Sequence, residues 1–227
     1  NAGLEEDELY ERFQGGIGER PDFPAAAVTR LDSLYVLPYL AHAPMEPMVC
    51  VADVKGDRCE VWASTQSPAA VRSSAAGGAG VPAANVIVHV MLTGGGFGRR
   101  LSGDYGGEAA ALSKAVGAPV QIVWSRDDDM RRASHYRPAS HHAMRGALDG
   151  DGKPVMFHHK MAIATTGGDD LLGTGGPGEV PAFVREPGEE RETLQAPSYD
   201  IPNTRGERAN VRLPVPTGAW RSVDATQ

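Results

Sequence analysis

The sequence has few cysteines, little positive charge and no long hydrophobic run, and each shortage excludes a class of protein. Only two of the 227 residues are cysteine, too few for a disulfide framework. No apolar run reaches about 18 residues, so no stretch is typical of a membrane-spanning helix. With 22 Lys and Arg against 29 Asp and Glu, the formal net charge is −7. That balance argues against a nucleic-acid-binding protein, which usually carries a basic patch.

The remaining composition is that of a globular protein. Hydrophobic residues make up 41% and charged residues 22% of a chain long enough for one large domain or two small ones. Residues 1–28 are acidic and then rich in glycine and proline, which indicates a linker or peripheral arm with a short helix at most. Residues 29–227 form the main body. Within it, the Gly-, Pro- and Glu-rich segment 165–197 predicts a long excursion, either a functional lid or a disordered insertion.

The apolar pattern between these segments mixes strands with a few helices. Strands are predicted over residues 34–37, 49–54, 59–63, 86–92, 120–124, 140–148 and 154–164, with an extended segment over 209–215. A helix is predicted over 69–76, with Ser67 as N-cap, Pro68 at the first helical position and Gly77-Gly78 at its end. A second helix is predicted over 108–116. Turn residues at Lys55–Asp57 and Asp149–Gly152, each between two predicted strands, indicate two hairpins. The order strand, loop, helix, strand from 86 to 124 indicates one crossover unit. The whole pattern fits α+β or mixed α/β, and we predict α+β with mixed sheets.

Several residue types that often carry chemistry favour structural roles here. Cys50 and Cys59 lie on neighbouring predicted strands; we interpret them as packed thiols, although a disulfide is geometrically possible. Asp127–Asp129 fits a helix N-terminus better than a metal site, because adjacent carboxylates diverge. The pairs His141-His142 and His158-His159 point to opposite faces of their strands, so we expect one buried and one solvated member in each. A metal site made of protein side chains alone is not predicted.

The most informative stretch is Gly94–Arg100, which follows the apolar strand at 86–92. A strand that ends in so many glycines brings bare backbone close to another group. One interpretation is a loop whose N–H groups face an anionic or oxo-bearing cofactor. The other is a tight turn that needs positive φ angles and nothing more. Spacing alone leaves both open, since the run is neither a complete dinucleotide fingerprint nor a Walker loop.

Four segments in a fixed order narrow the choice. They are Leu40–Pro47, Val61–Gln66, Gly94–Arg100 and Gly218–Val223. This ordered set resembles the molybdenum-binding large subunit of the xanthine dehydrogenase/aldehyde oxidase family. The nearest branch is the isoquinoline 1-oxidoreductase beta-subunit group, often labelled membrane-bound aldehyde dehydrogenase. The likeness runs from about residue 30 to the end and also includes Trp124–Asp128, Tyr136–Ala139 and the Asp149–Gly152 turn.

The resemblance implies a bacterial enzyme with a molybdopterin cofactor in its cytosine dinucleotide form. The metal in this family is never held by protein side chains alone. Phe97 would form a wall of the substrate pocket, and Arg221 would be a catalytic residue that orients a carbonyl or stabilises negative charge. The resemblance assigns cofactor contacts to Gly95, Gly96, Phe97, Gly98 and Gln66.

The sequence departs from the family pattern at several points. Leu40-Ala41-His42 stands where relatives outside this branch have a glutamine beside the molybdenum oxo group, and Asp224 stands where glycine is usual. The family's catalytic base is a glutamate far downstream of the segment at 218–223, and this sequence ends at Gln227. No glutamate near the end lies in a matching context; those compared are Glu179, Glu186, Glu189 and Glu190.

We therefore expect the middle portion of a large subunit, either a fragment or one piece of a split protein, without turnover by itself. The complete enzyme would oxidise an aldehyde or N-heterocycle with water as the oxygen source. Its partners would be the rest of the large subunit and an iron–sulfur subunit with [2Fe–2S] clusters, and the resemblance favours the periplasm over the cytoplasm. The alternative is a non-catalytic binding or scaffold module that keeps the fold without the cofactor.

Overall fold

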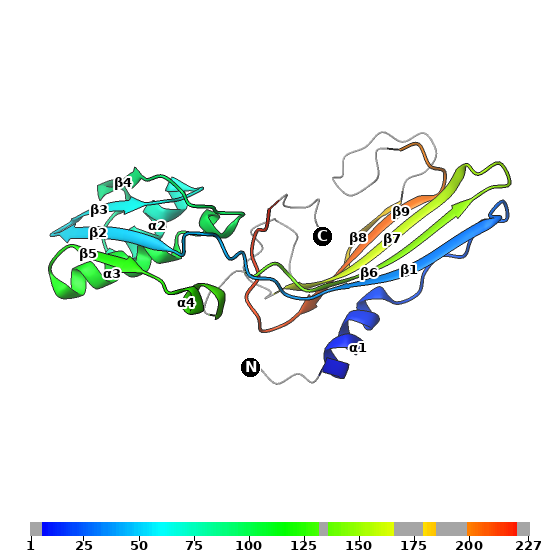
Figure 1. The fold of residues 1–227 in the computed structure, drawn as a ribbon, viewed down its shortest axis with the longest axis horizontal. Coiled ribbons are helices and arrows are strands. Elements are labelled where there is room, and N and C mark those ends of the chain that lie inside the picture. Colours follow the sequence, from blue (N-terminus) through cyan, green and yellow to red (C-terminus); the bar gives the residue numbers. More distant parts are fainter. Residues whose placement is uncertain (1–5, 132–135, 166–178, 185–198, 222–227) are drawn as a thin grey trace. The chain divides into compact units, whose positions relative to one another are not determined.

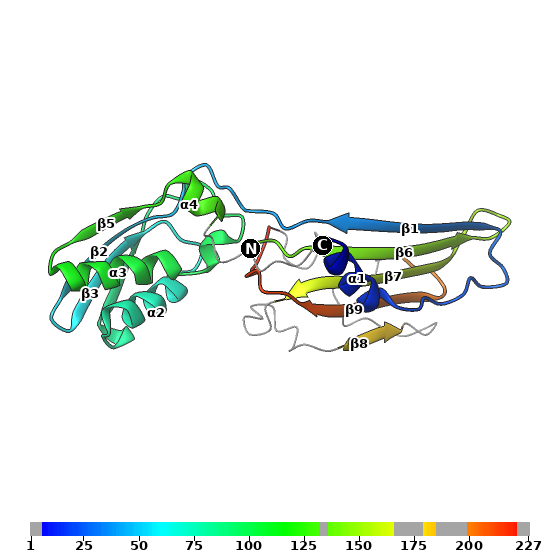
Figure 2. The same ribbon diagram turned by 90° about the horizontal axis from the view of Figure 1, so that it is seen from below.

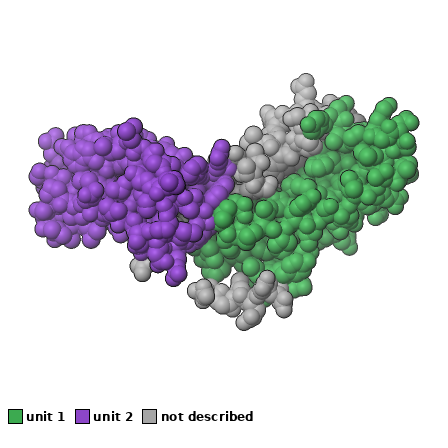
Figure 3. Space-filling view, viewed as in Figure 1, with its two compact units in different colours: residues 1–40, 137–218, 222–227 green, residues 41–136, 219–221 purple. Residues whose placement is uncertain are grey.

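The computed structural model describes residues 6–131, 136–165, 179–184 and 199–221 (Figure 1). The chain divides into two units, coloured separately in Figure 3. Unit 1 comprises residues 1–40, 137–218 and 222–227, and unit 2 comprises 41–136 and 219–221. Each unit contains its own sheet and at least one helix, which confirms the predicted α+β class. No helix among the described residues is long and apolar enough to cross a membrane.

Unit 1 is built on a five-stranded sheet in the order β1-β6-β7-β9-β8. Its elements are α1 (Glu6–Ile17), β1 (Thr29–Leu37), β6 (Ser140–Leu148), β7 (Pro154–Thr165), β8 (Glu179–Val184) and β9 (Thr204–Arg212). β6 and β7 form the predicted hairpin, in which Asp149 Oδ1 accepts hydrogen bonds from the N–H groups of Asp151 and Lys153 at 3.0 and 2.9 Å. The predicted excursion at 165–197 contains strand β8, paired antiparallel with β9; most of the excursion lies outside the described residues.

Helix α1 is longer than the short helix that the sequence indicated. Its 12 residues carry Leu9, Phe13 and Ile17 at four-residue spacing, so one face is apolar. Phe13 and Ile17 are buried against the sheet of unit 1. A Cβ on Gly16 would lie 3.1 Å from the Cβ of Ala162, so glycine allows the helix to approach β7 closely. The first 28 residues therefore include a packed part of unit 1.

Unit 2 is a four-stranded sheet with helices on one face. The sheet order is β4-β3-β2-β5, and Figure 2 shows α2 and α3 on the same side of it. The elements are β2 (Val49–Lys55), β3 (Arg58–Ala63), α2 (Pro68–Ala79), the short 3₁₀ helix η1 (Ala83–Asn85), β4 (Val86–Val90), η2 (Arg99–Leu101), α3 (Asp104–Val116), β5 (Val120–Val123) and α4 (Arg126–Arg131). The predicted crossover joins β4 to β5 through α3, and β3 and β2 lie between these strands.

Helix α2 continues through Gly77-Gly78, where the sequence predicted its end. Ser67 caps its start as expected, with Oγ accepting a hydrogen bond from Ala70 N at 3.3 Å. The helix ends at Gly80, whose φ is 63°. A Cβ on Gly78 would lie 2.1 Å from the carbonyl oxygen of Gly107 in α3. Glycine at 78 is therefore a close-packing residue between two helices rather than a helix breaker.

The histidine pairs are more buried than predicted. His141 and His142 are both buried, because α1 covers one face of the sheet and polar partners surround the other ring. Phe13 stacks on His141 at 4.5 Å between ring centroids. In the second pair His158 is buried, while His159 is partly exposed, closer to expectation.

The cysteines and the acidic triplet behave as interpreted. Cys50 and Cys59 are free, buried thiols, and burial raises the pKa of Cys50 to about 12. Register pairs Cys50 with Ala63 on β3 rather than with Cys59. Asp127–Asp129 occupies the first turn of α4, as its helix-terminus interpretation required.

Candidate functional site

The glycine loop Gly94–Gly98 leaves the end of β4 and enters the short helix η2. Three of its residues have positive φ: Gly95 at 100°, Phe97 at 55° and Gly98 at 103°. Glycine accepts such angles easily, whereas Phe97 occupies a region that side-chain-bearing residues rarely adopt. Backbone strain of this kind persists only where surrounding contacts enforce it. The loop is therefore held in shape by its neighbours.

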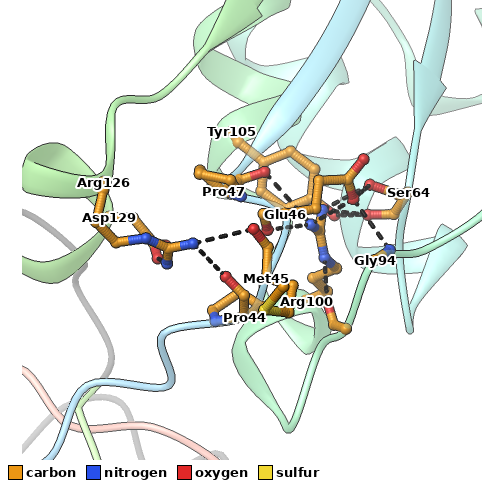
Figure 4. A network of polar contacts seen from close by, with 11 residues as sticks. Pro44, Met45, Glu46, Pro47, Ser64, Gly94, Arg100, Tyr105, Arg126 and Asp129 are labelled. Atoms are coloured by element: carbon orange, nitrogen blue, oxygen red, sulfur yellow. Dashed lines mark hydrogen bonds and ion pairs between the residues drawn. The ribbon is translucent and has the colours of Figure 1, made fainter.

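Arg100 is the largest of these restraints. Its side chain is fully buried and its guanidinium reaches three segments at once (Figure 4). Nε donates to Gly95 O at 2.7 Å, and Nη1 donates to Ser64 O and Oγ at 3.1 and 2.6 Å. Nη2 donates to Glu46 O and Oε2 at 2.8 and 2.7 Å, with Pro47 O more distant at 3.4 Å. A planar guanidinium suits this task because its five N–H groups point in fixed directions.

Glu46 completes this cluster from the proline-rich segment before β2. Its Oε2 atom accepts hydrogen bonds from Arg100, from Ser64 Oγ at 3.0 Å and from Gly94 N at 3.2 Å. Its own N–H donates to Gly94 O at 3.1 Å. Three donors, one of them a guanidinium, therefore converge on a single carboxylate oxygen. Glu46 therefore ties the start of the loop to the same buried charge that holds Gly95.

A second arginine holds the neighbouring chain. Arg126 donates to the carbonyl oxygens of Pro44 and Met45 and to Asp129 Oδ2, the last at 2.8 Å (Figure 4). Asp129 is buried, and that burial raises its pKa despite the nearby arginines. The segment that carries Glu46 is thus fixed on two sides.

Arg99 is also buried, but it faces away from the loop's carbonyl groups. Its guanidinium makes two hydrogen bonds to the carboxylate of Asp104, at 2.9 and 2.8 Å. It also lies over the ring of Trp124, 5.3 Å from the centroid. Two adjacent arginines therefore have separate tasks: Arg99 anchors the start of α3, and Arg100 holds the glycine loop.

Gln66 lies against the glycine loop, and the sequence prediction had placed both in one group. Gln66 Oε1 accepts a hydrogen bond from Gly98 N at 3.0 Å, and a Cβ on Gly96 would lie 2.4 Å from the same oxygen. The Gly98 N–H is thus engaged within the protein, although we had expected it to face the cofactor. Gln66 supports the loop directly.

The segment that ends the described chain lies against the loop. A Cβ on Gly98 would lie 2.2 Å from Ala219 O, and His42 Nε2 lies 2.8 Å from the same oxygen. The rings of His42 and Trp220 are 4.6 Å apart. Arg221, the predicted catalytic residue, follows directly and is exposed. The parts of the four predicted segments that belong to unit 2, residues 41–47, 61–66, 94–100 and 219–221, thus contribute to one region of that unit.

Three consecutive N–H groups of the loop remain available. In the part of the chain that the structure describes, those of Gly95, Gly96 and Phe97 donate no hydrogen bond. Phe97 is 42% exposed beside them, and its ring would touch a Cβ placed on Gly95 at 3.0 Å. Backbone donors next to an aromatic side chain suit a ligand with acceptor oxygens and an apolar part.

The glycine loop therefore fits an oxo-bearing cofactor, because the N–H groups of Gly95, Gly96 and Phe97 are open to donate to an oxygen ligand in the described structure. Within the described ranges no group of three or more His, Cys, Asp or Glu side chains could hold a metal ion. Glu186, Glu189, Glu190 and Asp224 lie outside the described residues, and Glu179 begins β8.

The sequence prediction gave no role to the side chains that shape the loop, although most of them lie in the segments it singled out. They are Glu46, Ser64, Arg100, Arg126 and Asp129. A usable signal was present, because Arg99-Arg100 follows an apolar strand and a glycine run. Arginines at such a position must find buried partners. The partners of Arg100, Ser64 and Glu46, lie 36 and 54 residues away in sequence, and only the fold brings them together.

Comparison with known proteins gives the class of protein. Residues 5–173 match the family described as molybdopterin cofactor-binding domain, and the chain belongs to that family. The match covers most of the chain, including all of β2–β5 and the glycine loop. The resemblance to the xanthine dehydrogenase/aldehyde oxidase family is thereby confirmed.

Two curated relatives agree with the predicted branch. The isoquinoline 1-oxidoreductase subunit beta of Brevundimonas diminuta is 28% identical over 99% of this chain and 28% of its own length. The membrane-bound aldehyde dehydrogenase [pyrroloquinoline-quinone] of Gluconacetobacter polyoxogenes is 35% identical over 60% of this chain and 18% of its own length. The chain thus spans less than a third of either relative.

Solved structures support the fold. The aldehyde oxidoreductase of Desulfovibrio gigas aligns with a TM-score of 0.67 at 21% identity, covering 88% of this chain and 21% of that one. At this level of identity the match establishes the architecture of the chain and does not identify its site residues.

Proposed function

We propose that this chain is part of the large subunit of a molybdenum hydroxylase and that its glycine loop binds the molybdopterin cofactor. The complete enzyme oxidises an aldehyde or an N-heterocycle with oxygen from water. The observation that carries the proposal is the run of three open N–H groups at Gly95, Gly96 and Phe97, in a chain of the molybdopterin-binding family. When bound, the cofactor supplies the oxygen transfer and accepts two electrons.

The residues of this chain then have distinct tasks. The N–H groups of Gly96 and Phe97 bind an oxygen ligand of the cofactor, because a donor array held in advance favours negative charge on that oxygen. Phe97 forms an apolar wall for the substrate. Gln66 and Gly98 keep the loop in register through their hydrogen bond. Arg221 orients the substrate carbonyl or stabilises charge that develops on it.

The finer assignments follow from the family pattern. We propose the cytosine dinucleotide form of the cofactor, and transfer of electrons to [2Fe–2S] clusters on a partner subunit. The curated relative from Brevundimonas is named as a beta subunit, which supports an assembly of more than one chain. We place the catalytic base in a segment outside this sequence, so turnover requires the complete large subunit.

Metal analysis of the complete complex tests the proposal. The large subunit is co-expressed with its iron–sulfur partner in a host that makes the cytosine dinucleotide cofactor, purified, and assayed for molybdenum and iron by mass spectrometry. About one molybdenum per complex is expected. A purified, folded complex without molybdenum would refute the proposal. It would favour the scaffold alternative, or a quinone cofactor of the kind named for the Gluconacetobacter relative, which extraction would detect.

A substitution in the loop places the cofactor more closely. In Gly96→Val the new side chain clashes with Gln66, because a Cβ at position 96 would lie 2.4 Å from Gln66 Oε1. Gln66 must then move and release the Gly98 N–H, so molybdenum content should fall strongly while unit 2 stays folded. Gly77→Val is the matched control, because a Cβ there meets nothing within 4 Å. Equal molybdenum in both variants would contradict the placement of the cofactor at this loop.

A further inference from the structure

We propose that Arg100 is a positioning residue that sets the direction of the Gly96 N–H, the middle donor of the loop. This inference deepens the proposed function and rests on it for the identity of the bound group. Arg100 acts through the backbone, since its guanidinium is fully buried among protein acceptors. It therefore has a task distinct from that of Arg221 or Phe97.

The geometry of the peptide bond links the direction of each carbonyl to that of the next N–H. In a planar trans peptide the C=O of one residue and the N–H of the next point in opposite directions. Fixing a carbonyl oxygen therefore also fixes the direction of the following N–H. When a donor inside the protein holds the carbonyl oxygen, the following N–H points away from the protein interior.

Each of the three open N–H groups is preceded by a held carbonyl. Gly94 O accepts from Glu46 N at 3.1 Å, which directs the Gly95 N–H away from that segment. Gly95 O accepts from Arg100 Nε at 2.7 Å, which directs the Gly96 N–H away from the buried guanidinium. Gly96 O accepts from Arg99 N at 2.9 Å and so fixes the Phe97 N–H. Among the described residues, only the middle carbonyl of the three depends on a side chain.

The middle peptide can also rotate easily once its side-chain donor is removed. It joins two glycines, and glycine populates positive and negative φ with similar ease. The Gly94–Gly95 peptide joins two glycines as well, but its carbonyl is held by the backbone of Glu46. Without the Nε donor, the Gly95–Gly96 peptide can turn its carbonyl oxygen toward the ligand side. An acceptor oxygen would then replace a donor next to an oxygen ligand, which is repulsive. Arg100 prevents this rotation because Ser64 and Glu46 hold its guanidinium in one plane.

Lysine cannot replace arginine at this position. An ammonium group has three donors at a single point, whereas Arg100 donates in several fixed directions at once. If the ammonium pairs with Glu46 and Ser64, it leaves Gly95 O without its donor. Arg100→Lys therefore keeps the charge and removes the proposed function of the side chain. Arg100→Gln is a second variant that avoids an unpaired ammonium if the lysine variant folds poorly.

Arg99→Lys is the matched control. Arg99 is the adjacent residue, is buried as Arg100 is, and also pairs with a carboxylate, that of Asp104. Its side chain donates to no carbonyl of the loop in the described structure. Any general loss of stability from replacing a buried arginine should therefore appear in both variants, and a change of peptide orientation only in Arg100→Lys.

The experiment compares wild type, Arg100→Lys and Arg99→Lys in the complete complex. Molybdenum per complex, the melting temperature and the crystal structure of the loop are measured for each. Loss of one hydrogen bond to a charged oxygen corresponds to roughly a tenfold weaker affinity. Arg100→Lys should therefore lose most of its molybdenum on dialysis, while Arg99→Lys, at a similar melting temperature, retains most of it. The Gly95 carbonyl should be rotated in crystals of Arg100→Lys and unchanged in those of Arg99→Lys.

Two results would overturn the inference. One is an unchanged Gly95–Gly96 peptide in the folded Arg100 variants. The other is an equal loss of molybdenum in the Arg99 and Arg100 variants, which would reduce the role of Arg100 to general stability. If wild type contains no molybdenum, the proposed function fails instead, and the orientation of the peptide in the crystals still decides the role of Arg100.

Discussion

The two units bury polar side chains in opposite ways. Unit 2 pairs each buried charge with a partly exposed partner: buried Arg100 with Glu46, and buried Asp129 with Arg126. Unit 1 buries imidazoles and keeps them neutral. Burial, followed by the charge of His159, lowers the pKa of His142 to about 4. His142 accepts or donates through both ring nitrogens, to Ser140 at 2.8 Å and to His159 at 2.9 Å.

Because of this difference, we expect the stability of unit 1 to depend on pH in mild acid more than that of unit 2. The glycine loop is held by hydrogen bonds with Arg100 and Glu46, and no imidazole takes part in them. The histidine cluster must take up protons in acid and then loses its packing. The two responses can be measured separately, because all three tryptophans, Trp62, Trp124 and Trp220, lie in unit 2. Tryptophan fluorescence therefore reports on the unfolding of unit 2.

The largest effect should come from breaking the charge pair at the loop. Glu46→Ala leaves the buried Arg100 guanidinium without its carboxylate, which should lower the free energy of unfolding of unit 2 by about 3 kcal/mol. Denaturant unfolding followed by tryptophan fluorescence measures it. Arg131→Ala is the control, because the Arg131–Asp127 pair is exposed and should contribute less than about 0.5 kcal/mol. Similar losses in both variants would show that the Glu46 pair is no stronger than a surface pair.

A pair of glycine substitutions separates backbone strain from close contact. Gly98 and Gly117 both have positive φ, 103° and 70°, but a Cβ on Gly98 would lie 2.2 Å from Ala219 O, and one on Gly117 meets nothing within 4 Å. Gly117→Ala should cost about 1 kcal/mol for the φ angle alone. Gly98→Ala should cost about 2 kcal/mol more, since the backbone must shift. Equal melting temperatures would mean that the chain at Ala219 moves away freely.

The histidine cluster should make unit 1 sensitive to acid. The pKa of His142 is about 4 in the folded chain and near 6.5 when unfolded, so the unfolded chain binds more protons between these values. Stability is therefore complete above pH 6.5 and falls as pH drops toward 4, by at most about 1.4 kcal/mol per pH unit for this group. The pKa values of His141, His158 and His159 are also lowered, chiefly by burial, and add in the same direction.

Hydrogen exchange in peptides from β6 and β7 measures this dependence at several pH values. His142→Gln should flatten it, because the amide keeps hydrogen-bonding groups without titrating. Exchange in β2 and β3 of unit 2 serves as the internal reference. An unchanged pH profile in the variant would show that His142 is not the titrating group.

The sequence predicted the parts of this molecule that depend on local pattern. Turn residues between strand formers predicted both hairpins, and Ser67-Pro68 predicted the start of α2. The predicted end of α2 was wrong, because Gly78 does not end the helix but allows it to pack closely against Gly107 of α3. The burial of both His141 and His142 was missed for the same cause, since α1 covers His141 from a segment interpreted as an arm.

The site was only half predictable. Ordered motifs identified Gly95–Gly98 and Gln66 as one group, and the structure brings them together. Nothing in the local pattern indicated that Arg100 would hold Gly95 O while pairing with Glu46, because those partners meet only after β2, β3 and β4 form one sheet. Motifs indicate which backbone is exposed, and tertiary contacts decide which way it points.

The smallest predicted effect concerns Tyr105, the neutral member of the charged cluster. Its hydroxyl donates to Ser64 O at 2.8 Å, and Arg100 Nη1 donates to the same oxygen at 3.1 Å. Tyr105→Phe removes one of two donors and leaves the carbonyl satisfied, so unit 2 should lose about 1 kcal/mol or less. In an Arg100→Gln background Ser64 O has lost its other donor, and the same substitution should cost roughly twice as much. Additive losses, measured by fluorescence-detected unfolding of the four proteins, would show that the two donors act independently.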